Sequence, residues 1–306
     1  MKIGYTEPND ADFIRWTSNL LRTFIENGEI IIASDGDRPD VLLASIWRKH
    51  KFPAGVPVIL VSNENWQLFQ PHAPLRKYHA VLGLYEPPEP CTFIQFPYAA
   101  VHFDVAVDEL YTLRAELMAT EKTEFCCFVA SNTMGDLAKE RMALFGRINQ
   151  WQRVDSGGAI LNNLGYRAPR GLEFLRWIAK YKYMICIENS LQPYYITEKP
   201  YQAWFAGTVP IYNGGHIGHL NPHAIVNASS PHVLTELQRI EASPELYESK
   251  RRASLTDSPL SLGSFVQQFR ALVLDPGRPK AVLAEPPTRP HVSFARRLAS
   301  LIRQRR

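Results

Sequence analysis

Short apolar runs alternate with amphipathic stretches along most of the chain. Short apolar runs predict buried strands, and stretches with an apolar residue every three to four positions predict helices. The predicted strands are Lys2–Tyr5, Ile30–Ala33, Val41–Ser45, Val58–Val61, Ala80–Leu84, Thr92–Phe96, Phe125–Ala130, Trp151–Val154, Tyr183–Ile187 and Val209–Tyr212. The predicted helices are Asp12–Glu26, Val105–Met118, Gly135–Asn149, Gly171–Lys180, Glu198–Ala206, Val233–Arg252 and Leu262–Leu274. This alternation predicts an α/β fold with mostly parallel sheets covered by helices.

The alternation is interrupted by a short polar segment, Ala119–Thr123, and then begins again. A chain of 306 residues is long enough for two medium domains. We therefore predict a first domain over 1–120 and a second over 121–275. Two α/β halves of this size are typical of facing Rossmann-like domains, with ligand bound in the cleft between them at the carboxyl ends of the strands. The last segment, 276–306, reads as a proline-rich linker and a basic amphipathic tail.

The net charge of +4 is concentrated in that tail, because residues 286–306 hold six arginines and no acid. Subtracting these six charges from the total leaves −2 for residues 1–285. A nucleic-acid-binding protein more often carries its basic residues across the fold, so we expect no nucleic-acid partner. A short helix with arginines and an apolar stripe is typical of binding to an anionic membrane surface. A disordered, solubilising tail is the equal alternative.

Several common site motifs are missing from the sequence. It contains no dinucleotide fingerprint, no phosphate-binding P-loop and no nucleophile elbow. No apolar run approaches the ~20 residues that span a membrane, and the first residues lack the apolar core of a signal peptide. We expect a cytoplasmic protein with reduced cysteines, located peripherally on the inner face of the membrane if the tail binds there.

Residues 183–215 carry the strongest chemical signal: a strand, an acid–amide pair, a loop, a helix start, and a second strand that ends in Gly-Gly. Thr197 is a predicted helix cap. The helix N-terminus and Lys199 would both favour a phosphate group. Glu198 would repel phosphate, so it more plausibly accepts hydrogen bonds from sugar or ribose hydroxyls. The alternative is that Glu198 only complements the helix dipole.

This segment, with ICIENS followed by YYITEKPYQAWFAGTVPIYNGG, closely resembles the donor-binding motif of the α1,3/4-fucosyltransferases, glycosyltransferase family 10. The resemblance continues upstream in FCCFVASN (125–132), VDSGG (154–158) and NNLGY (162–166), and covers about 125–215. It implies a two-domain GT-B architecture and the inverting transfer of L-fucose from GDP-fucose to a glycan hydroxyl. The expected linkage is α1,3 to GlcNAc or Glc in a LacNAc/Lewis-type or lipid-linked acceptor, which makes an oligosaccharide or glycolipid the second substrate.

Site residues follow from this resemblance position by position. It implies that Asn189, Tyr195, Glu198 and Lys199 line the GDP-fucose pocket. Glu198 would hold fucose or ribose hydroxyls, as a member of the catalytic set, and Lys199 would meet the diphosphate. Arg141 matches a diphosphate-binding arginine, which could clamp the phosphates with two hydrogen bonds. The alternative for Arg141 is a surface position on its helix.

Inverting transfer needs a carboxylate that takes the proton from the acceptor hydroxyl. Glu64 lies just past the strand Val58–Val61, where cleft residues gather, and is the predicted general base. A plain turn or helix-start carboxylate is the alternative for Glu64, and Glu86 and Glu89 are rivals for its role. The donor half has no Asp-x-Asp, so we predict that no metal and no other cofactor is required.

The sequence indicates less clearly which residues would bind the acceptor. Trp47, Trp66 and Tyr98 could stack on sugar faces, although core packing is the commoner role of such residues. Two other functions remain open: transfer of another sugar from a nucleotide donor by the same fold, and non-catalytic binding of a glycan or nucleotide. A nucleic-acid-binding protein that works through its arginine tail is a third reading, which the nearly neutral body disfavours.

Overall fold

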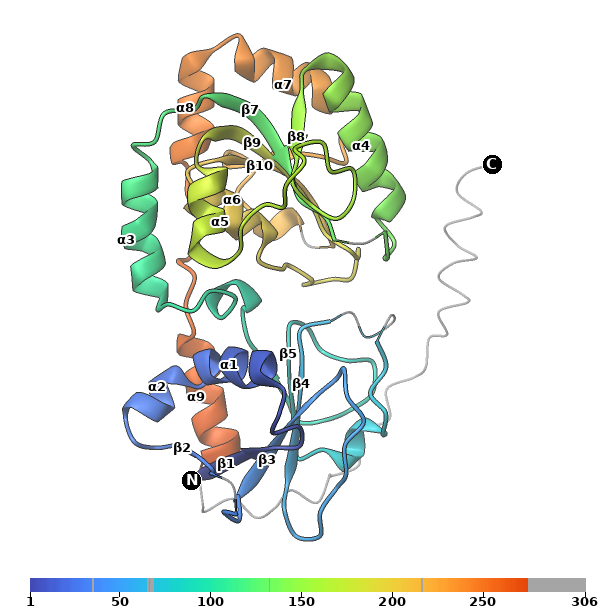
Figure 1. The fold of residues 1–306 in the computed structure, drawn as a ribbon, viewed down its shortest axis with the longest axis vertical. Coiled ribbons are helices and arrows are strands. Elements are labelled where there is room, and N and C mark those ends of the chain that lie inside the picture. Colours follow the sequence, from blue (N-terminus) through green and yellow to red (C-terminus); the bar gives the residue numbers. More distant parts are fainter. Residues whose placement is uncertain (35, 65, 67–68, 132, 216, 275–306) are drawn as a thin grey trace. The chain divides into compact units, whose positions relative to one another are not determined.

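The computed structural model describes residues 1–274, apart from positions 35, 65, 67–68, 132 and 216 (Figure 1). The predicted linker and tail, 276–306, lie outside the described residues. Two sheets are present, and every strand pair in both is parallel. Each sheet has its own set of helices, as the alternating sequence pattern predicts.

The first sheet has the strand order β2-β1-β3-β4-β5-β6. Its strands are β1 (Lys2–Tyr5), β2 (Ile31–Ile32), β3 (Val41–Ser45), β4 (Val58–Ser62), β5 (Ala80–Gly83) and β6 (Phe93–Gln95). Its helices are α1 (Ala11–Leu20), α2 (Arg22–Glu26) and α9 (Gly263–Phe269), with the π-helical turn η4 (Arg270–Leu274) after α9. Two short 3₁₀ turns, η1 (Leu75–Lys77) and η2 (Tyr98–Ala100), lie in its loops. The predicted helix Asp12–Glu26 is therefore two helices that meet at Leu21.

The second sheet has the strand order β11-β10-β9-β7-β8. Its strands are β7 (Glu124–Phe128), β8 (Val154–Ser156), β9 (Tyr181–Ile187), β10 (Val209–Asn213) and β11 (Val226–Asn227). Its helices are α3 (Val107–Leu117), α4 (Ala138–Trp151), α5 (Gly171–Ile178), α6 (Lys199–Phe205), α7 (Val233–Glu241) and α8 (Pro244–Arg252), and η3 (Ile217–His219) is a 3₁₀ turn. Proline at the start of α8 ends the single helix predicted over Val233–Arg252, because proline cannot donate a hydrogen bond inside a helix.

Both faces of the second sheet are buried, and β9 shows how. Tyr183 and Ile185 pack with α4 and α7 on one face, while Met184 and Cys186 pack with α5 and α6 on the other. Side chains alternate across a strand, so a strand buried on both faces reads as one continuous apolar run. Trp151, predicted to open a strand, is instead the last residue of α4.

Two helices pack against a different sheet from the one that the predicted domain boundaries assign to them. Helix α3, which the prediction placed in the first domain, packs in the core of the second sheet through Leu110, Leu113 and Leu117. Helix α9, which the prediction placed in the second domain, packs in the core of the first sheet through Phe265 and Phe269. The chain therefore connects the two α/β halves twice, once before β7 and once after α8.

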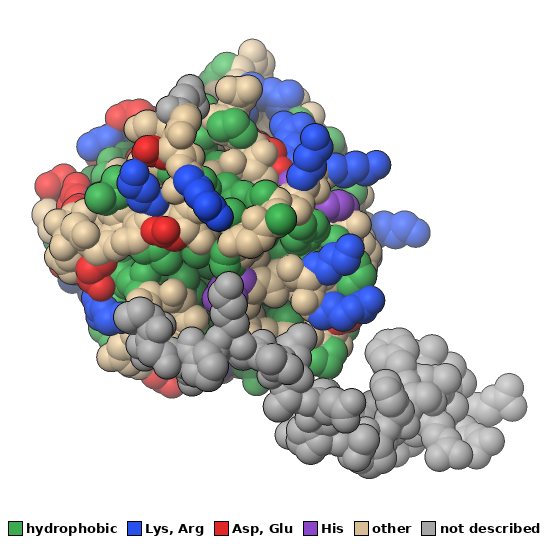
Figure 2. All heavy atoms as spheres, turned by 90° about the horizontal axis from the view of Figure 1, so that it is seen from below, with side chains coloured by type: hydrophobic (Ala, Val, Ile, Leu, Met, Phe, Trp, Pro, Cys, Tyr) green, Lys and Arg blue, Asp and Glu red, His purple; other side chains and the backbone are tan. Residues whose placement is uncertain are grey.

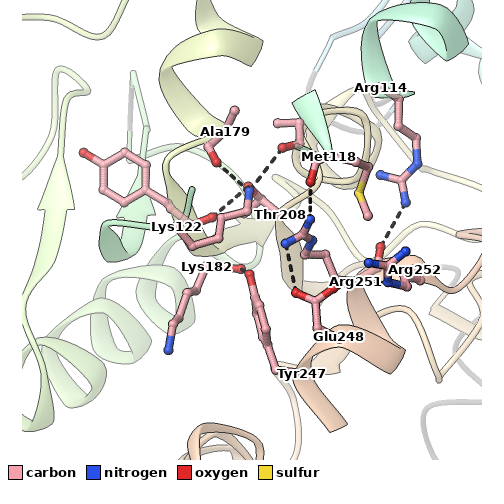
Figure 3. Close-up of polar contacts among 12 residues, drawn as sticks. Arg114, Met118, Lys122, Ala179, Lys182, Thr208, Tyr247, Glu248, Arg251 and Arg252 are labelled. Atoms are coloured by element: carbon pink, nitrogen blue, oxygen red, sulfur yellow. Dashed lines mark hydrogen bonds and ion pairs between the residues drawn. The ribbon is translucent and has the colours of Figure 1, made fainter. Parts of the chain in front are cut away.

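The connection before β7 is fixed by cations that bind backbone carbonyls (Figure 3). The ammonium of Lys122 donates to the carbonyl oxygens of Ala179 at 2.5 Å and Ala206 at 3.3 Å, and to Thr208 Oγ1 at 3.3 Å. The two alanines are the C-terminal caps of α5 and α6, where carbonyls are free and the helix dipole favours a cation. Arg114 lies over the Trp204 ring at 3.7 Å and donates to the Arg251 carbonyl at 2.9 Å.

Candidate active site

The loop after β9 is closed by one buried carboxylate. Glu188 is fully buried and accepts hydrogen bonds from the Thr197 backbone N–H at 2.8 Å and from Thr197 Oγ1 at 2.7 Å. Residues 189–196 are thereby held as a loop whose two ends are joined. Thr197 does not cap α6 as predicted, because its side chain is committed to Glu188, and Glu198 occupies the cap position instead. Glu188 therefore has the structural role that its burial requires.

Glycine allows other segments to approach this loop closely. A Cβ at Gly215, the second glycine of the Gly-Gly pair, would overlap the backbone carbonyl of Gln192. A Cβ at Gly135 would overlap the backbone carbonyl of Asn189, and Gly135 also has a φ of 96°, which other residues rarely adopt. The chain before α4 and the chain after β10 thus both pack directly against the backbone of the loop.

Lys199 joins Glu188 to Glu198. Its Nζ lies 3.1 Å from Glu188 Oε2, 2.9 Å from Thr197 Oγ1 and 3.6 Å from Glu198 Oε1. Burial opposes the charge on Lys199, but the two carboxylates hold its pKa above the ordinary value. Burial also opposes the charge on Glu198, but Lys199 and His102 keep its pKa below the ordinary value. Lys199 is therefore a cation and Glu198 an anion at neutral pH.

The structure brings together two further residues that the sequence named. Arg141 on α4 is only 4% exposed, and it donates from Nη1 to Asn189 Oδ1 at 2.8 Å. The alternative of a surface arginine does not hold, because the side chain is buried and contacts Asn189 in the loop of residues 189–196. Burial lowers the pKa of Arg141, and nearby Glu188 opposes that change.

Tyr195, predicted from the family resemblance to line the donor pocket, is 2% exposed and belongs to the core of the first sheet. Its ring meets Tyr85 edge-on, with centroids 6.0 Å apart. Burial raises the pKa of its phenol, and the charges that act on it include Lys199 and Glu188. The ring therefore joins the loop of residues 189–196 to the first half of the chain, while contact with a donor stays a prediction.

Glu64 lies where the chain leaves β4 and is half-buried. Burial raises the pKa of its carboxyl to about 7; Lys199 opposes this rise and Glu198 adds to it. The charged pair of the second half thus acts electrostatically on the predicted base of the first half. Glu86 and Glu89, the other candidates for the general base, fit this role less well. Glu86 is exposed, and Glu89 accepts a hydrogen bond from the Leu75 backbone N–H at 3.2 Å.

Sequence reasoning missed a hydrogen-bonded chain between the two halves. The Gln202 amide nitrogen lies 3.1 Å from His102 Nε2, and His102 Nδ1 lies 3.3 Å from the Tyr98 hydroxyl. An amide nitrogen only donates, so Nε2 accepts, and Nδ1 carries the proton that is donated to Tyr98. Burial lowers the pKa of His102, which keeps the ring neutral. His102 belongs to no motif, so no sequence signal could have found it.

The three aromatic residues proposed for sugar stacking have different positions. Trp66 is a core residue, and its backbone and indole N–H groups both donate to Tyr85 at 3.0 Å. Trp47 is 52% exposed and lines a cavity of about 560 Å³, and Tyr98 lines the same cavity. Tyr98 also lines a second cavity of about 370 Å³. The predicted donor residues Arg141, Asn189, Glu198 and Lys199 are not among the described lining residues of either cavity.

A metal centre is not evident in the described part of the chain. No group of three or more histidine, cysteine, aspartate or glutamate residues lies close enough to hold an ion within residues 1–274, leaving aside the six undescribed positions there. All four cysteines are free thiols. The independence of activity from metal stays a prediction for a chelator experiment.

Comparisons with known proteins match the second half of the chain. Residues 119–249 match the family model described as glycosyltransferase family 10 (fucosyltransferase) C-term. The chain is 37% identical over 108 residues to alpha-(1,3)-fucosyltransferase FucT of Helicobacter pylori, which covers 35% of this chain and 21% of that protein. It is 36% identical over 90 residues to alpha-(1,3)-fucosyltransferase B of Drosophila melanogaster, which covers 27% of this chain and 20% of that protein. The match thus spans about a fifth of these relatives.

The fold agrees over a larger share of the chain. A crystal structure of an alpha1,3-fucosyltransferase with GDP-fucose has a TM-score of 0.64 and 20% identity to this chain, and the match covers 92% of each chain. A crystal structure of an alpha1,3-fucosyltransferase with GDP has a TM-score of 0.63 and 19% identity. The predicted fold class, α/β of GT-B type with two Rossmann-like halves, is confirmed. The sequence match over residues 119–249 thus makes the second half similar to the C-terminal part of glycosyltransferase family 10, and the fold extends the similarity to most of the chain.

Proposed function

We propose that this protein transfers L-fucose from GDP-fucose to a hydroxyl group of a glycan, with inversion at the anomeric carbon. The observation that carries the proposal is the electrostatic environment of Glu64. Burial raises the pKa of its carboxyl to about 7, Lys199 opposes this rise and Glu198 adds to it. A general base works best when its pKa lies near the working pH, because it is then available and still basic. The match to the fucosyltransferase family model, and the GDP-fucose in a crystal structure with a similar fold, support fucose as the sugar.

In the proposed reaction, the acceptor oxygen forms a bond to C1 of fucose while the bond from C1 to the diphosphate oxygen breaks. Glu64 takes the proton from the acceptor hydroxyl, and the electron pair of the broken bond leaves with GDP. Negative charge then develops on the diphosphate, where Lys199 and Arg141 stabilise it. Glu198 and Asn189 form hydrogen bonds with the hydroxyl groups of the donor, and these bonds position C1 for attack.

The contacts of Lys199 fit this division of roles. Its ammonium holds Glu188 at 3.1 Å and Thr197 at 2.9 Å, while Glu198 lies farther away, at 3.6 Å. When a hydroxyl group of the donor binds Glu198, the interaction between Lys199 and Glu198 can be lost, and one N–H of Lys199 becomes available to a phosphate oxygen. The buried pair with Glu188 keeps the ammonium in place in the absence of donor, so its orientation does not have to be assembled during the reaction.

The finer details also belong to the proposal. We expect an α1,3 linkage to GlcNAc or Glc in a LacNAc/Lewis-type or lipid-linked acceptor. We expect full activity in the presence of a chelator, because two cationic side chains act on the diphosphate in place of a metal. Complete loss of activity on chelation would contradict this expectation.

Two alternatives define the first experiment, since the fold also accommodates other nucleotide sugars and a binding function. Thermal unfolding is measured with GDP-fucose, GDP-mannose and UDP-galactose, because a ligand that binds only the native state raises Tm. A rise with GDP-fucose alone, which is lost in Lys199→Ala, supports the proposal. A rise with another nucleotide sugar indicates another donor, and binding of GDP-fucose without hydrolysis or transfer indicates a non-catalytic protein.

Attachment to a membrane stays a prediction for the tail, which lies outside the described residues. In the described part of the chain, no helix is long and apolar enough to cross a membrane. Removal of the residues after Glu285 should release the protein from membrane fractions, and unchanged fractionation would contradict the prediction. On the face that Figure 2 shows, basic side chains lie mostly towards one edge and acidic side chains mostly towards the other.

A further inference from the structure

The cavity of about 560 Å³ lies at the carboxyl ends of strands in the first sheet. Ser45 ends β3 and Val61 lies near the end of β4, and both line it. Asn63, directly before Glu64 in the chain, lines it as well. Its size falls in the range of sites that hold small ligands, and its wall reaches the segment that carries the proposed base.

The charged residues of this cavity are already paired with one another. Arg48 Nε lies 3.6 Å from Asp10 Oδ2. Arg15 lies 3.1 Å from Asp12 and 2.6 Å from Asp104, which lies just outside the lining. The four charged lining residues, two aspartates and two arginines, therefore sum to zero, and each arginine has a carboxylate partner. The charged lining therefore has no net positive charge that would attract an anionic ligand.

Trp47 gives the cavity an exposed aromatic wall. Its ring is 52% exposed and leans on Phe69, with centroids 4.2 Å apart, while its backbone N–H donates to Ser45 Oγ at 3.2 Å. The indole thus contacts Phe69 and still leaves about half of the residue uncovered. The C–H face of a sugar ring is apolar and slightly positive, so it packs favourably on the negative face of an indole.

We propose that this cavity binds the acceptor as an uncharged oligosaccharide, with one sugar ring stacked on Trp47, and that the zero net charge of its two aspartates and two arginines favours such acceptors over those that carry a carboxylate or phosphate. This inference rests on the proposed transferase function and adds the substrate class of the acceptor side. The competing location is the cavity of about 370 Å³, whose exposed aromatic residue is Tyr194.

The test measures equilibrium binding of N-acetyllactosamine and of its sialylated form to the full chain, in the presence of GDP, without turnover. Trp47→Ala should raise the Kd for the neutral glycan by about three- to tenfold, the range expected for the loss of one stacking contact. Tyr194→Ala, in the other cavity, should leave that Kd unchanged. Ile31→Ala removes an exposed apolar side chain from the edge strand β2. It is the control that shows whether the loss of any exposed apolar side chain changes the Kd.

A second variant tests the charge argument independently. Asp10 accepts a hydrogen bond from the Phe13 backbone N–H at 3.1 Å and so caps α1, and asparagine caps equally well. Asp10→Asn should therefore leave the helix intact while it frees Arg48, and the sialylated glycan should bind more tightly than to the wild type. The matched control is Asp12→Asn, in which Arg15 keeps Asp104 and the gain should be smaller.

Several outcomes would overturn the inference. One is a wild-type preference for the sialylated glycan, and another is a Kd that responds to Tyr194→Ala but not to Trp47→Ala. Binding of GDP-fucose without binding of either glycan would also overturn it, while leaving the donor assignment intact. Failure of the proposed function has a different signature, because the protein would then not bind GDP-fucose at all.

Discussion

The two halves of the molecule prepare their parts of the site in different ways. In the second half, charged side chains are buried and joined before any ligand arrives: Glu188 holds Thr197 and Lys199, and Arg141 holds Asn189. In the first half, Glu64 is only half-buried, and the charge pairs Arg48–Asp10 and Arg15–Asp12 are largely exposed. The predicted site residues of the second half are thus held in place by buried contacts, whereas those of the first half lie on loops at the ends of strands.

This difference also explains which half the comparisons detect. The family match covers residues 119–249 and so falls within the second half. Buried pairs and close glycine contacts allow few substitutions, because each change leaves a polar group without a partner or creates an overlap. Loops that line an open cavity tolerate more change and can be altered to suit the acceptor.

The largest expected effect tests the contribution of the first half. Glu64→Gln keeps the shape of the side chain but removes the base, and kcat/KM for transfer should fall about 10²- to 10⁴-fold. The control is Glu86→Gln, which changes an exposed carboxylate and should leave the rate unchanged. A loss smaller than about threefold for Glu64→Gln would remove Glu64 from the reaction.

The next effect tests the preformed pairs of the second half. Lys199→Met leaves the buried carboxylate of Glu188 without its cation, which should lower the free energy of unfolding by about 3–5 kcal/mol. Urea unfolding measures this change. The double variant Glu188→Gln with Lys199→Met should be more stable than Lys199→Met alone, because no buried charge remains unpaired. Equal stability of the single variant and the wild type would show that the pair is not formed.

A smaller effect tests how the second half is attached to the connecting chain. Lys122→Met removes the donor to Ala179, Ala206 and Thr208, and should lower the free energy of unfolding by about 1–3 kcal/mol. The matched control is Lys182→Met, which breaks a partly exposed pair with Glu241 and should cost about 0–1 kcal/mol. If the two variants lost the same stability, the contacts of Lys122 would have no special role.

The smallest effect tests whether the charge of Glu198 in the second half acts on Glu64 in the first. Glu64 must lose its proton to act as a base, so kcat/KM should rise as the pH increases through about 7. Glu198 raises the pKa of Glu64, so in Glu198→Gln the midpoint of this rise should move to lower pH, despite a lower overall rate. A midpoint that does not move would mean that the two carboxyl groups lie too far apart to interact.

The same group makes a prediction for stability, with a definite sign. The folded-state pKa of Glu64 lies above its ordinary value of 4.5, so the folded protein binds this proton more tightly than the unfolded chain. Its contribution to stability is complete below pH 4.5 and is lost as the pH rises through about 7. Glu64→Gln should remove this part of the pH dependence, which unfolding measurements between pH 4 and 8 would detect.

The sequence by itself determined the two parallel sheets and the donor motif, because both are local in the chain. A buried strand such as β9 needs only a short apolar run, and Glu188 through Lys199 lie on one loop, so their order already indicates their proximity. It did not reveal the strand β11, which has only two residues, or the division of two predicted helices.

Only the tertiary structure decided which distant residues meet. Lys199 acts electrostatically on Glu64, and His102 contacts Gln202, because the chain folds its two halves together, and no periodicity encodes such pairs. The structure also decided that Trp66 is buried while Trp47 faces a cavity. The physical reason is that strand and helix patterns extend over about ten residues, whereas burial and pKa depend on everything that packs around a side chain.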